Sequence, residues 1–137
     1  MAAFWDAHGA SEAAFEAGER LSRIEVSGYR PLLRTGIHLG RPRKIGGDYF
    51  GVDVNIAARL AEAANPGEVL ISDRTLRALD GAHAVPAERR LSAKGTPANL
   101  TAYVLESPRS ASAQGSDDPG GGHRRTPAST LSGPAHD

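Results

Sequence analysis

Apolar side chains near the start of the chain repeat at helical spacing. They form one stripe of a predicted helix that begins at Ser11, with Glu12 in its first turn. The stripe consists of Ala14, Ala17, Leu21 and Ile24. Its small alanines indicate close packing against a sheet. The preceding residues 1–5 (MAAFW) are apolar and end abruptly, so we interpret them as the end of a buried strand and expect a truncated module.

The remaining pattern alternates strands and helices and ends in a hairpin. Strands are predicted over residues 31–38, 68–72, 84–91 and 100–105, and helices over residues 52–64 and 73–79. Asp53 is the predicted N-cap of the longer helix, which Asn65-Pro66-Gly67 ends. Gly46-Gly47 predicts a chain reversal before it, and Ser72 and Asp73 are the predicted caps of the shorter helix. This mixture predicts an α+β fold, with helices packed on a mainly antiparallel sheet.

Residues 107–137 differ in composition from the rest of the chain. They are rich in Gly, Pro and Ser, and Leu131 is their only large apolar side chain. Such a segment buries too little surface to offset its conformational entropy, so it is predicted to be disordered. Residues 1–106 are then the single folded unit, long enough for a small core.

Charge and composition exclude several classes of protein. The formal net charge is zero, so the basic excess expected of a nucleic-acid-binding protein is absent. The chain has no cysteine and therefore no disulfide or thiolate metal site. Its apolar runs are too short to span a membrane, and Met1 does not open a signal peptide, so a cytoplasmic protein is expected.

The helix predicted over residues 52–64 carries the side chains that best indicate chemistry. Asn55 and Arg59 lie four residues apart and project from one face. Glycines before the helix let the backbone approach a phosphate that the helix dipole favours. Arg59 adds a fixed fork of donors for phosphate oxygens. The pattern indicates an anion or nucleotide site; the alternative is a local helix cap beside a solvated arginine.

Residues 34–40 read RTGIHLG, residues 48–60 read DYFGVDVNIAARL, and residues 66–70 read PGEVL. These three motifs, in this order along the chain, resemble those of class III adenylate and guanylate cyclases. Lys94-Gly95 is similar to a late lysine-glycine pair of the family. The resemblance implies the C-terminal part of the ferredoxin-like class III nucleotidyl cyclase fold. It also implies conversion of ATP, or alternatively GTP, to a cyclic nucleotide and pyrophosphate in intracellular signalling.

The resemblance further implies roles for four residues. Asn55 resembles the asparagine that orients the ribose, and Arg59 resembles the arginine that stabilises charge on the α-phosphate. Asp48 resembles the aspartate that reads the purine, with a simple turn residue as the alternative. Lys94 resembles the lysine that holds the terminal phosphates. His38, at a strand end, is interpreted as a packing or hydrogen-bonding residue rather than a ligand or base.

The family's two metal ions, Mg²⁺ or Mn²⁺, lead to a separate expectation. Two aspartates hold both ions, and both precede a strand that residues 1–4 (MAAF) resemble, so this chain is expected to lack them. No metal ligand is assigned, because Asp6 comes too late and Asp53 occupies a helix start. Family sites form between two subunits. The chain is expected to be inactive alone and to supply the Asn55 and Arg59 half in a homodimer, or in a heterodimer with a complete cyclase domain.

Three interpretations remain open from the sequence. The chain is a cyclase fragment that a partner completes, a non-catalytic dimerisation or regulatory module, or a truncated gene product without a separate function. An upstream in-frame segment carrying the metal aspartates would favour the last interpretation.

Overall fold

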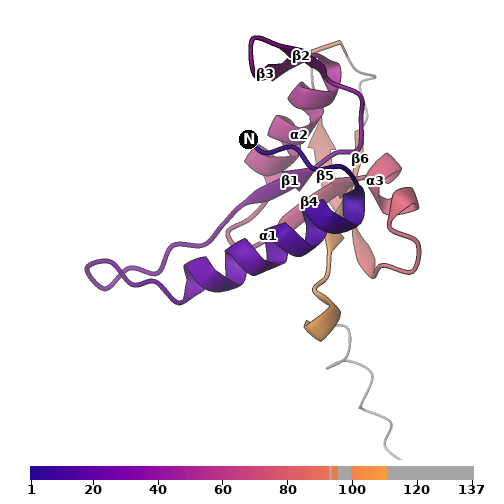
Figure 1. Ribbon diagram of the computed structural model, residues 1–137. Coiled ribbons are helices and arrows are strands. Elements are labelled where there is room, and N and C mark those ends of the chain that lie inside the picture. The colour runs from indigo at the N-terminus through magenta and orange to yellow at the C-terminus, as the bar shows by residue number, and fades with distance from the viewer. Residues whose placement is uncertain (93, 96–99, 111–137) are drawn as a thin grey trace, which may run out of the picture.

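The computed structural model describes residues 1–92, 94–95 and 100–110. Its helices are α1 (Ala7–Ser22), α2 (Val52–Ala63) and α3 (Asp73–Ala78). Its strands are β1 (Thr35–Ile37), β2 (Arg43–Ile45), β3 (Asp48–Phe50), β4 (Val69–Ser72), β5 (Ala84–Leu91) and β6 (Leu100–Leu105). Helices pack on strands from both sides (Figure 1), so the α+β prediction is confirmed.

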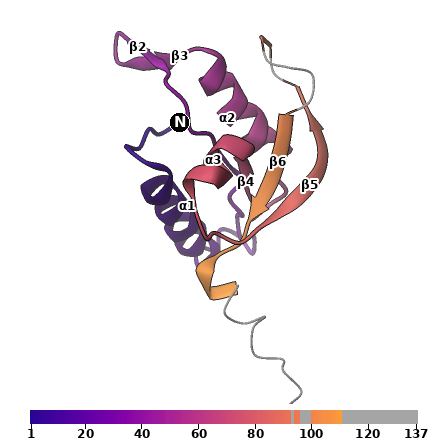
Figure 2. The same cartoon turned by 90° about the vertical axis from the view of Figure 1, so that its right-hand side faces the viewer.

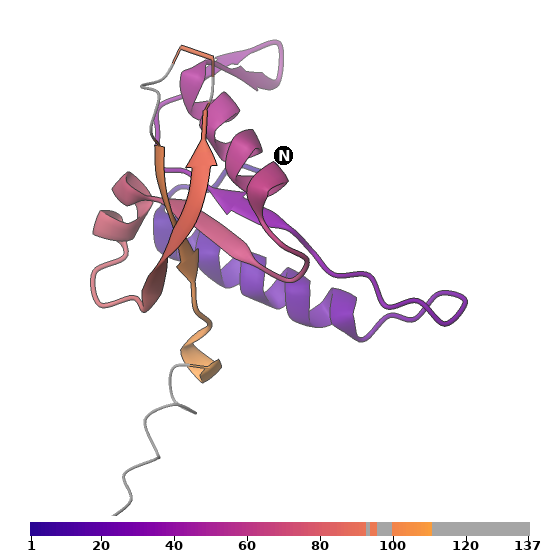
Figure 3. The same ribbon diagram turned by 180° about the vertical axis from the view of Figure 1, so that it is seen from behind.

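A four-stranded sheet runs in the order β1-β4-β6-β5, with β1 at one edge. β1 and β4 are parallel, with Thr35 opposite Val69, whereas β4 pairs antiparallel with β6 and β6 antiparallel with β5. The hairpin of β5 and β6, seen from behind in Figure 3, has a register shift between Ala87 and Leu91. The sheet is therefore mixed and mainly antiparallel, as predicted.

β2 and β3 form a separate hairpin next to the start of α2 (Figure 2). Gly46 and Gly47 make its turn, with φ of 59° and 91°. Both values lie in the left-handed region that glycine adopts without steric cost. The two glycines thus explain why the chain reverses where the sequence predicts a reversal.

Each face of the sheet is covered by its own apolar cluster. On one face the buried side chains are Ala7, Ala14, Ile37, Val69, Ile71, Leu79 and Leu105, which join α1 and α3 to the strands. On the other face they are Ile56, Leu60, Ala64, Leu70, Leu91 and Ala102, which join α2 to the strands. Leu70 and Ile71 are both fully buried, because successive residues of β4 point to opposite faces. The molecule therefore has three layers.

The structure corrects the prediction for residues 1–5. They form no strand, and Met1, Phe4 and Trp5 are 84%, 51% and 103% exposed. An apolar run becomes a strand only where a neighbour supplies ladder hydrogen bonds. Residues 1–5 pair with no strand of the described part of the chain, so their composition alone does not make a strand.

The start of α1 also differs from the prediction. The helix begins at Ala7 rather than Ser11, because Asp6 caps it by accepting a hydrogen bond from the N–H of Gly9 at 2.6 Å. Ser11 is buried inside the helix, where its hydroxyl donates to the Ala7 carbonyl at 2.8 Å. The predicted apolar stripe is also corrected: of its residues only Ala14 is buried, whereas Ala17 and Ile24 are exposed and Ile24 lies beyond the end of α1. The buried residues of the helix are Ala7, Ser11 and Ala14, so its first half makes the contact with the sheet.

Two more predictions are corrected. The strand predicted over residues 31–38 pairs only over Thr35–Ile37, because its short partner β4 limits the ladder. Asp53 is not the N-cap of α2; Gly51 takes that position and Asp53 lies in the first turn. Of the two predicted caps of α3, Ser72 is confirmed, since its side chain accepts from the N–H of Thr75, whereas Asp73 is the first residue of the helix. The bounds of α2, α3, β4, β5 and β6 agree within about a residue.

Most of the predicted tail, residues 107–137, lies outside the described residues. Of its first four residues, Arg109 contacts Glu19 of α1, with Nη1 to Oε1 at 3.1 Å. The domain boundary near residue 106 therefore stays a prediction. Among the helices that the structure describes, none is both long and apolar enough to cross a lipid bilayer.

Glu68 joins the start of β4 to β5 and to the end of α2. Its carboxylate accepts from both terminal guanidinium nitrogens of Arg89, and Arg89 also donates to the Ala63 carbonyl at 3.2 Å. The two side chains are only 15% and 30% exposed. The hydrogen bond from Arg89 outweighs partial burial and holds the pKa of Glu68 below its usual value.

Thermal stability is therefore expected to fall as the pH is lowered below about 4.3, the usual value for Glu. A carboxylate whose pKa is depressed in the folded state stabilises the fold above its unfolded pKa, and this contribution is lost as the pH falls through the folded pKa. Glu68→Gln should flatten the dependence of Tm on pH, measured by circular dichroism. Arg89→Gln should flatten it similarly. If Tm depends on pH as steeply in both variants as in the wild type, the Glu68–Arg89 pair is not the cause of this pH dependence.

Candidate functional site

α2 is held against β1 at very short range. A Cβ atom on Gly36 would lie 2.3 Å from the backbone N of Ala61 and 2.4 Å from the backbone O of Ala57. Only a residue without a side chain lets the helix backbone come this close. Ile56 and Leu60, 7% and 1% exposed, complete the contact with the sheet. Packing thus fixes which face of α2 points outward.

Asn55 and Arg59 lie on that outward face. Both residues are exposed, and the Arg59 side chain keeps 53% of its surface accessible. Arg59 Nη1 lies 2.8 Å from the Glu62 carboxylate, one turn further along the helix. Because the buried positions face the sheet, Asn55 and Arg59 stay available to a molecule outside the chain.

The turn that contains Lys94 lies beside the first turn of α2. A Cβ atom on Gly95 would be 3.4 Å from Cγ2 of Val52. Val52, Asn55 and Arg59 are successive members of one helical stripe, three and four residues apart. Lys94 itself is exposed, and the described part of its turn is visible above α2 in Figure 3. The structure therefore brings Lys94 to the same side as Asn55 and Arg59.

Asp48 is less closely associated with Asn55, Arg59 and Lys94 than these three residues are with one another. It is the first residue of β3 and is exposed, whereas its neighbour Tyr49 is half-buried and lines a cavity. Side chains alternate along a strand, so Asp48 points away from that cavity. Within the described residues, no hydrogen bond or ion pair joins Asp48 to Asn55 or Arg59. Its position relative to α2 depends on how the β2–β3 hairpin is held.

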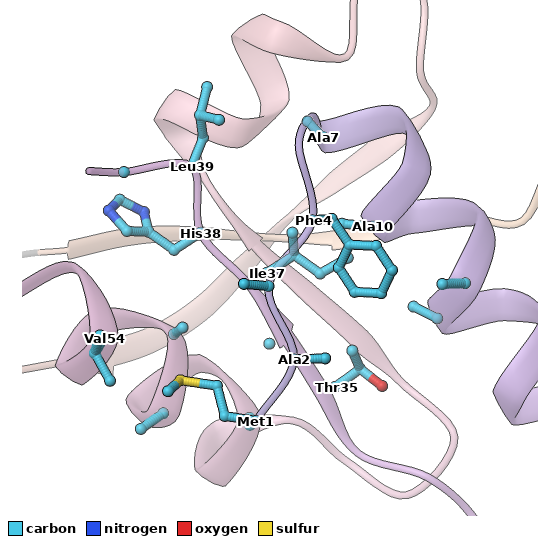
Figure 4. Close-up of a pocket in the computed structure, with 18 of the residues that line it drawn as sticks. Met1, Ala2, Phe4, Ala7, Ala10, Thr35, Ile37, His38, Leu39 and Val54 are labelled. Carbon is cyan, nitrogen blue, oxygen red and sulfur yellow. The ribbon is translucent and has the colours of Figure 1, made fainter. Parts of the chain in front are cut away.

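A cavity of about 810 Å³ opens beside the free edge of β1. Its walls are alanine-rich stripes of α1 and α2, including Ala13, Ala17, Ala57, Ala58 and Ala61. Figure 4 shows residues 1–4 running past Ile37, with Phe4 toward α1 and Met1 toward α2. Asn55 and Arg59 do not line the cavity, so it and the candidate nucleotide site lie on different faces of α2. The sequence indicated close packing of α1, but not this opening.

His38, at the end of β1, lies between two polar side chains. Its Nδ1 is 2.7 Å from Ser72 Oγ and its Nε2 is 2.8 Å from Asp53 Oδ1, and the side chain is only 6% exposed. The hydrogen-bonding role expected of His38 fits these contacts. Partial burial acts to raise the pKa of Asp53, but the Arg41 N–H, His38 and the charge of Arg74 outweigh it and hold that pKa below its usual value.

Comparison with known proteins identifies the family. A family model described as the adenylate and guanylate cyclase catalytic domain matches residues 7–107. The chain belongs to this cyclase family. A pH-sensitive adenylate cyclase of Mycobacterium tuberculosis is 42% identical over 59 residues, which are 43% of this chain and 15% of that protein. An uncharacterized protein of the same species is 38% identical over 93 residues, 67% of this chain and 22% of that protein.

Solved cyclase structures share the fold of this cyclase domain. An adenylate/guanylate cyclase/hydrolase from Silicibacter pomeroyi aligns with a TM-score of 0.63 and 23% identity, covering 77% of this chain and 65% of that one. The guanylate cyclase domain of RhGC from Catenaria anguillulae, solved with GTP, aligns with a TM-score of 0.59 and 20% identity, covering 74% and 59%. The chain thus spans under two thirds of these structures and under a quarter of the curated relatives.

The described part of this cyclase chain does not offer a metal centre. Among its residues, no three His, Cys, Asp or Glu side chains gather closely enough to hold an ion. Asp53, in the first turn of α2, is engaged with His38 and with the backbone N–H of Arg41. Both oxygens of the Asp53 carboxylate are thus already engaged within the chain, and no chemical step through an ion is assigned to it.

Proposed function

We propose that this chain supplies one half of a nucleotide cyclase active site that a partner subunit completes. The substrate is ATP, with GTP as the alternative purine nucleotide. One observation carries the proposal: a helix locked against the sheet by Gly36 exposes Asn55 and Arg59 on one stripe, beside the turn that contains Lys94. Family membership supports the reaction class. We take residues 1–106 as the folded unit that supplies this half of the active site.

In the proposed reaction, the ribose 3′-hydroxyl loses its proton to solvent water and its oxygen bonds to the α-phosphorus, while the bond from the α-phosphorus to the bridging oxygen breaks and pyrophosphate leaves. Arg59 donates to the α-phosphate oxygens as charge develops on them, which is where a fixed guanidinium fork is most effective. Asn55 orients the ribose, and Lys94 neutralises the departing phosphates. Asp48 accepts from the exocyclic amine of adenine. These groups hold the reacting atoms in line, which supplies much of the rate in phosphoryl chemistry.

A heterodimer with a complete cyclase domain is the active form in this proposal. The partner supplies the ligands of the divalent ions in this proposal, which is supported by the absence of any cluster of three potential metal ligands among the described residues. A homodimer of this chain would contain two Asn55–Arg59 halves and is expected to be inactive.

The test mixes this chain with a complete cyclase whose own Asn and Arg are both replaced by Ala, and measures cyclic AMP formed from ATP with Mg²⁺ or Mn²⁺. We expect product in the mixture and none from either protein alone. The product should disappear when this chain carries Asn55→Ala. Product from this chain alone would overturn the assignment of the metal ligands to a partner, and a silent mixture would overturn the catalytic proposal.

Exposed apolar side chains near the proposed site favour a second candidate, a non-catalytic dimerisation or regulatory module. Phe50 and Val52, at the junction of β3 and α2, are 51% and 43% exposed. Such neighbouring apolar groups are common where a protein partner binds. In this case the chain would form a stable complex with a cyclase domain, detected by size-exclusion chromatography with light scattering, while the mixture makes no cyclic nucleotide.

A further inference from the structure

The carboxylate of Asp53 joins three segments of the chain. Its Oδ1 lies 2.8 Å from His38 Nε2, at the end of β1. Its Oδ2 accepts from the backbone N–H of Arg41 at 2.9 Å, two residues before β2. Asp53 itself belongs to the first turn of α2. One side chain therefore ties the sheet and the β1–β2 connection to the helix that carries Asn55 and Arg59.

The other side of His38 is anchored in the core. Its Nδ1 lies 2.7 Å from Ser72 Oγ, and Ser72 Oγ lies 3.0 Å from Thr75 Oγ1. Thr75 is fully buried; its hydroxyl donates to the Ile37 carbonyl and accepts from the N–H of Leu39. On this side His38 is therefore held by buried groups of the core, and it can in turn hold the Asp53 carboxylate in place.

Gly40 allows the carboxylate to reach this position. A Cβ atom on Gly40 would lie 2.2 Å from Cγ of Asp53 and 2.5 Å from its Oδ2. Any side chain there would displace the carboxylate from the Arg41 N–H. The glycine that ends the GIHLG motif is therefore explained by Asp53.

Two segments of chain, a β2 leg and a β3 leg, connect the β2–β3 hairpin to the rest of the domain. The β3 leg enters α2 through Gly51, whose φ of 124° lies in a region that essentially only glycine adopts. The β2 leg is tied to α2 through the Asp53–Arg41 hydrogen bond. Without that bond the hairpin, with Asp48 on it, would be free to pivot about Gly51.

We propose that Asp53 and His38 form a clamp that positions the β2–β3 hairpin against the first turn of α2 and so sets the spacing between Asp48 and the Asn55–Arg59 pair. Both are positioning residues. The charged groups that act on the Asp53 carboxylate are His38, directly after β1, and Arg74 from α3. The consequence for nucleotide turnover rests on the proposed function, whereas the clamp itself is a property of the fold.

A spin-label distance tests the clamp without any catalysis. The chain has no cysteine, so Arg43→Cys on β2 and Glu62→Cys on α2 provide the only two labelling sites, both exposed. Double electron–electron resonance should give a narrow distance distribution for the otherwise wild-type chain. Asp53→Ala should broaden it, and Asp53→Asn, which keeps an acceptor for the Arg41 N–H, should restore most of the narrow distribution. Asp73→Ala is the matched control, because it removes a first-turn carboxylate from α3 instead.

His38→Phe and Gly40→Ala should broaden the distribution as well, since each removes or displaces one contact of the carboxylate. Circular dichroism identifies the variants that fold. The clamp is supported if the folded variants broaden, and an unchanged distribution in all of them overturns it. If Asp53→Ala does not fold, the other two variants decide.

A second arm measures turnover in the mixture with the Asn/Arg-deficient cyclase. Asp53→Ala should lower kcat/KM by about 10- to 100-fold, because small misplacements of positioning groups have effects of that size. Asp53→Asn should recover most of the loss, and Asp73→Ala should match the wild type. A mixture that is silent even with the wild-type chain refutes the proposed function, while the distance measurement still decides the clamp.

Discussion

Gly36→Ala is expected to destabilise the domain by more than about 3 kcal/mol. The new methyl group would lie 2.3 Å from the Ala61 nitrogen and 2.4 Å from the Ala57 oxygen, and both are backbone atoms of α2 that no side-chain rotation can move away. The helix would have to leave the sheet and uncover Leu60, which is 1% exposed. Since small domains have only about 5–15 kcal/mol of stability in total, urea denaturation should show a sharp loss.

Gly18→Ala is the control for this prediction. Gly18 lies within α1, and a Cβ atom there would meet nothing within 4 Å. A glycine inside a helix costs about 0.5–1 kcal/mol relative to alanine, so this substitution should stabilise the protein slightly. If Gly36→Ala behaved like Gly18→Ala, the close packing of α2 on β1 would be wrong.

Arg59→Ala is expected to lower the cyclic AMP made in the complemented mixture by about 10²–10³-fold, the usual cost of losing one donor to developing charge. Its effect on stability should stay within about 0.5 kcal/mol. The side chain is 53% exposed, and its ion pair with Glu62 is a surface pair, which contributes little. Initial rates at saturating ATP, together with urea denaturation, separate the two quantities.

Arg77→Ala is the matched control for Arg59→Ala. Arg77 is also an exposed helical arginine with a nearby carboxylate, Asp73, but it lies on α3, away from the proposed site. It should leave turnover unchanged. Equal losses of turnover in the two variants would mean that the rate depends on overall surface charge rather than on a contact between Arg59 and the α-phosphate.

The sequence by itself determined the elements whose signals are local. The stop at Asn65-Pro66-Gly67, the Ser72 cap and the Gly46-Gly47 turn act within a few residues, so the corresponding elements agree with the structure. The four-residue spacing of Asn55 and Arg59 is likewise local, and it predicted their shared outward face. The motifs around them predicted the cyclase family, which the family match confirms.

Tertiary structure alone decided what depends on residues far apart in the chain. Residues 1–5 are apolar but lack a pairing neighbour, so they form no strand. Asp53 satisfies the N-cap pattern, yet its carboxylate forms a hydrogen bond with His38, 15 residues earlier in the chain. Gly36 and Gly40 belong to the RTGIHLG motif, but the need for glycine there comes from the backbone of α2 and the side chain of Asp53, which lie against them. The physical reason is the same in each case: strand pairing, close backbone contact and hydrogen-bond competition depend on distances that folding creates and that spacing along the chain does not encode.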